Sequence, residues 1–137
     1  MTTINAKKGE LVNLINGLFQ VQELKGKTFG LAVSKNIKIL QTELKDLEEA
    51  GKPSDEFMAL AQQVNEIANA DEEGAEAKIA ALEIENEELV KSRREQMDMV
   101  TALMEDEMTV ELNTLSEKML PEDITASQIN NIIKIIE

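Results

Sequence analysis

Apolar residues between positions 11 and 47 recur at helical spacing in two stretches. In the second stretch they follow one another at steps of four and three, which places them on a single stripe of a helix, and the first stretch provides a matching stripe. The two stripes are Leu11, Leu14, Ile15, Leu18 and Phe19, then Val33, Ile37, Leu40, Leu44 and Leu47. Such stripes pack against each other, so the pattern predicts a helical hairpin with one shared apolar seam.

The ends of these two helices are marked by glycine and proline. The first helix is expected to follow an extended lead at residues 1–5 and to run to about Leu24. Gly26 can end it in the left-handed conformation, and Thr28 can cap the second helix. The second helix is then expected to reach Ala50, just before Gly51-Lys52-Pro53.

Residues 53–108 read as an acidic helical arm. Ser54 can cap a helix whose apolar stripe comprises Phe57, Leu60, Ala61, Val64, Ile67 and Ala68. After Gly74 the chain has neither Gly nor Pro up to Met108, so one helix of roughly 50 Å is expected. Its thin seam is interrupted by Asn86 and Arg93, and such a rod must pair with the preceding helix, another copy or a partner.

The break before this helix has spacing that partly resembles a calcium loop. Asn69, Asp71, Glu73 and Gly74 fall at the first, third, fifth and sixth positions. The twelfth position is Ala80, where calcium loops need a bidentate acid. We interpret the segment as an acidic, solvated turn.

The period changes near residue 108. Met108, Val110 and Leu112 alternate with polar residues, which indicates a short strand over 108–115, paired at an edge in an assembly, or else more helix. Further on, Thr125 and Gln128 form a capping box for a short C-terminal helix. Four isoleucines follow at helical spacing, and they either dock on the chain's own hairpin or bind a groove in another protein.

These patterns predict a mostly all-α fold in a single domain over 1–137. Its parts are the helical hairpin (1–52), the acidic helical pair or coiled-coil arm (53–108), and the candidate strand with the amphipathic C-terminal helix (109–137). The three aromatic residues are all Phe, and a core of aliphatic side chains suits helix packing. The candidate contacts with other proteins are Val110, Leu112, Ile129, Ile132, Ile133 and Ile136.

Composition narrows the function classes. Cys and His are both absent, so thiolate sites, cysteine nucleophiles and a Ser-His-Asp triad are excluded. We therefore expect no enzyme, no cofactor and no small-molecule substrate. No apolar run approaches the roughly 18 residues of a membrane span, so no membrane partner is expected.

The net charge of −13 argues against direct binding of nucleic acid, whose phosphates select basic surfaces. The charge is unevenly spread: residues 1–52 carry eight Lys and six acidic residues, whereas residues 53–137 carry six basic and 21 acidic residues. This split reflects either solvated faces or complementarity between copies in a homo-oligomer.

Two places in the chain resemble a known group of proteins. They are Leu24-Lys25-Gly26 with Phe29, Val33, Lys35, Asn36 and Gly51-Lys52-Pro53-Ser54-Asp55-Glu56-Phe57, and Val110-Glu111-Leu112 with Leu120-Pro121-Glu122-Asp123-Ile124-Thr125 and Gln128. In these residues the chain resembles small acidic helical proteins of tailed phages and prophages, mostly of unassigned function. The resemblance implies synthesis in a host cytoplasm, a place in the virion or its assembly, and other phage proteins as partners.

Two functions therefore follow as expectations. The first is a non-enzymatic structural or assembly protein, such as a virion component, connector or assembly chaperone, that acts through helix packing and oligomerisation. The second is a soluble acidic inhibitor or regulator of a host protein, whose charge imitates nucleic acid.

Overall fold

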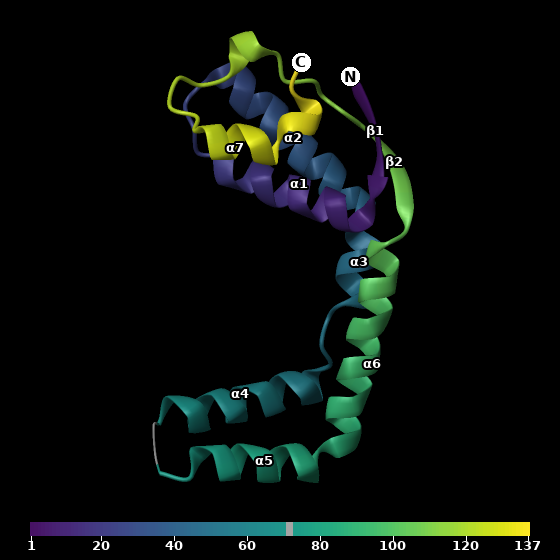
Figure 1. Cartoon of the computed structure of the whole chain (residues 1–137), viewed down its shortest axis with the longest axis vertical. Coiled ribbons are helices and arrows are strands. Elements are labelled where there is room, and N and C mark those ends of the chain that lie inside the picture. The colour runs from purple at the N-terminus through teal and green to yellow at the C-terminus, as the bar shows by residue number, and fades with distance from the viewer. Residues whose placement is uncertain (71–72) are drawn as a thin grey trace. The chain divides into compact units, whose positions relative to one another are not determined.

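The computed structural model describes residues 1–70 and 73–137 of the chain (Figure 1). Its elements are β1 (Thr2–Lys7), α1 (Lys8–Val21), α2 (Lys27–Glu43), α3 (Lys45–Ala50), α4 (Asp55–Asn69), α5 (Ala75–Glu85), α6 (Glu87–Met104), β2 (Glu107–Leu112), η1 (Glu117–Met119), α7 (Ala126–Asn131) and η2 (Ile133–Ile135). The fold is mostly α-helical with one small two-stranded sheet and a short C-terminal helix, as the sequence predicts.

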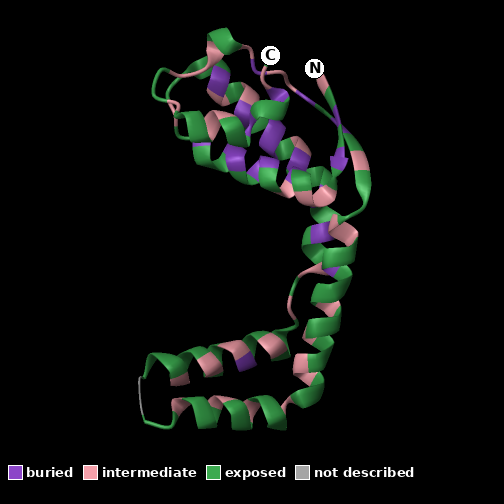
Figure 2. Cartoon of the chain, in the orientation of Figure 1, coloured by how far each residue is buried: buried purple, intermediate pink, exposed green. Residues whose placement is uncertain are grey.

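The chain divides into two compact units. Unit 1 comprises residues 1–47 and 102–137, and unit 2 comprises residues 48–101. Most buried positions belong to unit 1, as the purple segments of Figure 2 show. Each unit is described separately below.

The α1–α2 hairpin forms the core of unit 1. Nine of the ten predicted seam residues are buried, and Phe19 is the exception, with 38% of its surface exposed. Four predicted details of this hairpin are wrong, and one of them is the unbroken second helix up to Ala50, which is interrupted at Leu44 between α2 and α3. Helix α1 ends at Val21, before the predicted Leu24, and Thr28 lies within the first turn of α2, so it does not cap that helix. Gly26 precedes α2 at φ 133°, a conformation that favours glycine but is not the left-handed helical one.

The predicted strand is present as β2, and its partner is the chain's own N-terminus. Strands β1 and β2 pair antiparallel, with Ile4 opposite Val110 and Thr2 opposite Leu112. Ile4 and Ala6 on β1 face the core together with Val110 and Leu112 on β2, while the alternate residues are exposed or partly exposed. The expectation of a strand paired in an assembly is therefore replaced by pairing within unit 1.

The C-terminal segment docks on α1. The predicted capping box is present: the Gln128 amide N–H donates to Thr125 Oγ1 (3.1 Å), and the Thr125 amide N–H donates to Gln128 Oε1 (3.0 Å). The single face of four isoleucines does not form, because the helix ends at Asn131 and tightens into η2. As a result Ile132 and Ile135 are buried, while Ile133 is 52% exposed.

Two further contacts fix this segment. Leu115 pairs with the chain end, since its amide donates to the Ile135 carbonyl (2.8 Å) and its carbonyl accepts from the Glu137 amide (2.9 Å). The Lys134 ammonium lies 2.6 Å from the Glu10 carboxylate, and this hydrogen bond and charge hold the pKa of Glu10 below its ordinary value. Both groups are about half exposed, so the pair positions the tail more than it stabilises it.

Asn36 is the one buried polar residue among the described positions of unit 1. Its side-chain amide donates to the Asn113 carbonyl (2.9 Å), and its oxygen accepts from the Asn113 backbone amide (2.7 Å). Helix α2 therefore fixes the segment just after β2, because Asn36 hydrogen-bonds the backbone amide and carbonyl of Asn113, which lie beyond the strand pairing. A buried amide tolerates burial only with such partners.

Unit 2 begins with a helical hairpin in which α4 packs against α5 (Figure 1). Ser54 caps α4 as predicted, accepting from the Phe57 amide at 3.1 Å. The single long helix expected from Ala75 to Met108 is not formed, because the helix is interrupted at Asn86 between α5 and α6. Asp71 and Glu72 lie outside the described residues, and the predicted acidic turn and its calcium-like spacing fall partly on them.

A pair of glycine substitutions tests how closely the tail packs. A Cβ on Gly17 would lie 3.0 Å from the Asn131 Cβ and carbonyl oxygen and 3.2 Å from Ile132, whereas a Cβ on Gly30 meets nothing within 4 Å. We expect Gly17→Ala to destabilise the protein by about 1–3 kcal/mol through overpacking. The control Gly30→Ala should stabilise it by about 0.5–1 kcal/mol through helix propensity. Urea unfolding measures both, and equal effects would contradict the close packing.

Candidate protein-interaction surface

Polar side chains of α6 hold the turn that precedes α4 in unit 2. The Arg93 guanidinium donates to the Gly51 carbonyl (2.8 Å) and to Gln96 Oε1 (2.9 Å). The Gln96 amide in turn donates to the carbonyls of Ala50 (2.8 Å) and Lys52 (2.6 Å). We call this arrangement the Arg93 clasp. It provides hydrogen-bond donors to three successive carbonyls in the turn before α4, which have no partners within a helix.

The clasp also explains one polar interruption in the predicted seam. The Arg93 guanidinium carbon lies 5.5 Å from the centroid of the Phe57 ring, a distance at which a cation is attracted to the ring face. Arg93 therefore contributes two donated hydrogen bonds and a cation–π contact to unit 2.

The other interruption, Asn86, ends α5. Its side-chain amide donates to the Leu82 carbonyl at 2.9 Å, and its backbone lies at φ −111°, ψ 31°. Asparagine competes with the helical backbone for such bonds, which is the local reason that a helix break occurs here. Beyond the break α6 runs in a different direction from α5 (Figure 1).

Few residues of unit 2 are buried. Among the described residues of 48–101, only Leu60 and Val100 are buried. The predicted stripe of α4 is otherwise partly exposed at Phe57, Ala61, Val64 and Ile67, and Ala68 is exposed. Four large apolar side chains are exposed outright, namely Met58, Ile84, Met97 and Met99. Unit 1 also exposes four large apolar side chains, but it has a buried core as well; in unit 2 the exposed side chains accompany very little burial, which makes it the candidate interaction surface.

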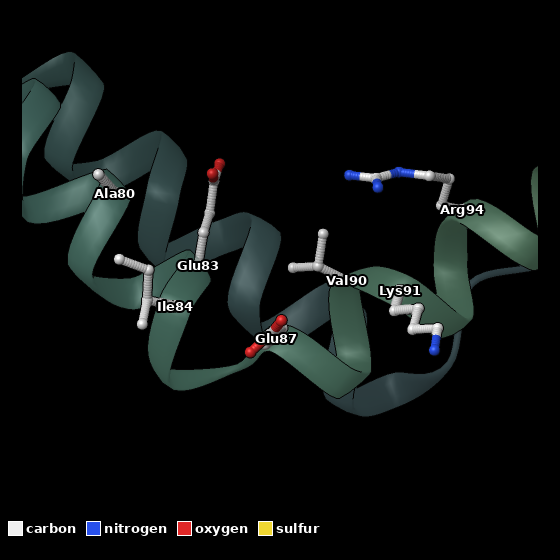
Figure 3. Close-up of a pocket in the computed structure, with 7 residues that line it drawn as sticks. All are labelled: Ala80, Glu83, Ile84, Glu87, Val90, Lys91 and Arg94. Carbon is white, nitrogen blue, oxygen red and sulfur yellow. The ribbon is translucent and has the colours of Figure 1, made fainter.

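A hollow of about 510 Å³ lies at the break between α5 and α6 (Figure 3). We call it the elbow hollow, and its lining residues are Ala80, Glu83, Ile84, Glu87, Val90, Lys91 and Arg94. Figure 3 shows Val90 between the acidic and basic side chains, with the Arg94 side chain directed back toward α5. Ile84 is 75% exposed, so this hollow combines an accessible apolar residue with charges of both signs.

The residues predicted as contacts lie elsewhere, in unit 1. Val110, Leu112 and Ile132 are buried in its core, Ile129 and Ile136 are partly exposed, and only Ile133 is well exposed. The structure brings the tail onto α1 and the strand onto β1, so these residues do not form one accessible face. The exposed residues of unit 2 were not among the predicted contacts, although the cluster of Met97, Met99, Met104 and Met108 is a sequence signal for an adaptable surface.

Two further observations concern other kinds of site. Within residues 1–70 and 73–137, Asp and Glu do not gather into groups of three or more that are suited to a metal ion. Over the same ranges, none of the helices has the length and apolar character that crossing a bilayer requires.

Comparison with protein families, curated proteins and solved structures finds no match to this chain. The geometry of unit 2 is therefore the basis for the functional argument below.

The Arg93 clasp can be tested with two neighbouring arginines. Arg93→Lys keeps the charge but loses the planar fork, so we expect unit 2 to lose about 1–3 kcal/mol of stability. Arg94→Lys is the matched control, because Arg94 is exposed and makes no ion pair with any described residue. Hydrogen exchange should accelerate in residues 48–69 for the first variant alone. Equal exchange in both variants would show that the clasp does not hold this turn.

Proposed function

We propose that this chain is a non-enzymatic structural or assembly protein that acts through helix packing, with unit 2 as its contact surface. One observation carries the proposal: residues 48–101 bury only Leu60 and Val100 among their described positions, and leave Met58, Ile84, Met97 and Met99 exposed. Association with a partner would bury more apolar surface and stabilise this unit, since helical stability in proteins comes mainly from packing.

The composition supports the non-enzymatic part of this proposal. The chain contains no His and no Cys, so the usual general base and the usual strong nucleophile are both missing from the sequence. The proposed activity needs neither, because it rests on burying apolar surface and matching charges.

The resemblance to small acidic proteins of tailed phages supports the finer form of the proposal. In that form the chain is a virion component, connector or assembly chaperone, made in the host cytoplasm, and its partners are other copies of itself or other phage proteins. Methionine-rich surfaces adapt to irregular partners, which suits a protein that must pack in an assembly.

A second function is favoured by one specific observation. Residues 48–101 contain 15 acidic and five basic residues, so unit 2 is far more acidic than the rest of the chain. A soluble inhibitor of a host protein that imitates nucleic acid would use such a surface. Its complex should dissociate as salt rises above physiological levels, where exposed charges more than about 8 Å apart are largely screened.

Photo-crosslinking in the producing cells tests the proposal. A photoreactive amino acid replaces Met99, which is 66% exposed in unit 2, and in a control it replaces Leu31, which is 56% exposed in unit 1. We expect position 99 to cross-link to a small set of structural or assembly proteins, and position 31 to give none of these products.

Mass spectrometry of washed particles and of lysate then separates the forms of the proposal. A fixed copy number in particles indicates a virion component, and cross-links to structural proteins in lysate alone indicate an assembly chaperone. Cross-links to a host protein that form when lysate is irradiated at physiological salt, but not when it is irradiated at high salt, would favour the inhibitor. Equal products from positions 99 and 31 would contradict an interaction surface on unit 2.

A further inference from the structure

The elbow hollow carries its charges in a fixed order along the chain. Glu83 and Glu87 come first, and Lys91 and Arg94 follow, with Ile84 and Val90 supplying apolar surface between them (Figure 3). Two of the five basic residues of unit 2 therefore lie on one face of an otherwise strongly acidic surface. The elbow hollow therefore carries charges of both signs, whereas the rest of unit 2 is mainly acidic.

These four charged side chains have no partners among the residues that the structure describes. None of them forms an ion pair or side-chain hydrogen bond with another described residue. The adjacent Arg93, by contrast, is committed to the clasp. The absence of pairing is informative because Glu87 and Lys91 are four residues apart on α6, the spacing at which such pairs form on a helix.

The order of residues is symmetric about Glu87. Glu83 and Lys91 lie four residues before and after it, and Ile84 and Val90 lie three residues before and after it. Ala80 and Arg94 lie seven residues on either side. An antiparallel contact about a two-fold axis near Glu87 would therefore place each residue opposite its counterpart in the other copy.

From this symmetry we infer that the elbow hollow binds a second copy of the same chain. The inference rests on the proposed function and names the partner at the surface of unit 2. Helix α5 of each copy lies along α6 of the other, so that Glu83 faces Lys91 and Ile84 packs against Val90. Two-fold symmetry makes each of these contacts twice.

Charge complementarity favours a second copy over a partner of uniform charge. A basic partner would meet Lys91 and Arg94 in the same hollow, and an acidic partner would meet Glu83 and Glu87. Only a partner with the reverse order of charges satisfies both ends, and another copy in antiparallel orientation has that order. The acidic surface of the rest of unit 2 repels copies in other orientations, which adds specificity.

Charge reversal on the full-length chain tests the inference. Sedimentation equilibrium over a range of concentrations should show a dimer of the unmodified protein. Lys91→Glu and Glu83→Lys each place like charges opposite one another twice, so each should weaken the dimer about tenfold or more. The double variant restores opposite charges and should recover dimerisation.

Glu87 supplies a test with the opposite sign. Near the axis the two Glu87 carboxylates face each other, so Glu87→Gln should tighten the dimer.

Lys52→Glu and Glu95→Lys are the matched controls for the two charge reversals, because both residues are exposed in unit 2 and neither lines the hollow. Circular dichroism confirms that each variant is helical before its association is compared.

The outcomes separate this inference from the proposed function. A chain that stays monomeric at every concentration, single reversals that match their controls, or a double variant that fails to recover would each overturn the elbow contact. If position 99 still cross-links to assembly proteins in that case, the proposed function stands without it. If the reversals behave as expected while position 99 finds no other protein, self-association stands and the wider proposal fails.

Discussion

Limited apolar burial in residues 48–101 is the constraint on which the rest of this structure depends. Burying an aliphatic side chain fully contributes about 1.5–3 kcal/mol, and Leu60 and Val100 are the only described residues of this unit that are buried. Unit 1 has the opposite character, because the α1–α2 seam, β1, β2 and the tail bury an apolar core (Figure 2). The two units therefore differ in how far each can be stable without a partner.

Polar side chains supply much of the order that unit 2 lacks in apolar core. Ser54 caps α4, the Arg93 clasp satisfies the carbonyls of residues 50–52, and Asn86 ends α5. Each of these interactions fixes a helix end or a turn. None of them covers the exposed apolar side chains of α4, α5 and α6, which stay accessible.

Local patterns in the sequence predicted local structure well. The seam of the N-terminal hairpin, the Ser54 cap, the Thr125–Gln128 capping box and the alternation of β2 are all confirmed, because each depends on residues close together in the chain. The partner of β2 was not predicted, since Ile4 and Ala6 alone are too short an apolar pattern to indicate a strand. Strand pairing is decided by distant residues.

The surface that we propose for interaction was not predicted, for a related physical reason. Periodicity identifies the residues that should be buried, and it directed attention to Val110, Leu112 and the tail isoleucines, three of which are used in the core of unit 1. Ile84 falls off the predicted seam of its helix, and Asn86 and Arg93 read only as interruptions. Their roles depend on the helix break and on carbonyls more than 40 residues earlier in the chain, which a helical period cannot reveal.

Hydrogen exchange at several protein concentrations tests the central claim most directly, because it reports on each segment of the unmodified chain. If unit 2 is an association surface, amides in α5 and in α6 up to residue 101 should become more protected as concentration rises, while the core of unit 1 keeps the same protection. The account would be contradicted if protection in α5 and α6 did not depend on concentration for the chain alone, and also did not increase when the proteins that cross-link to position 99 are added.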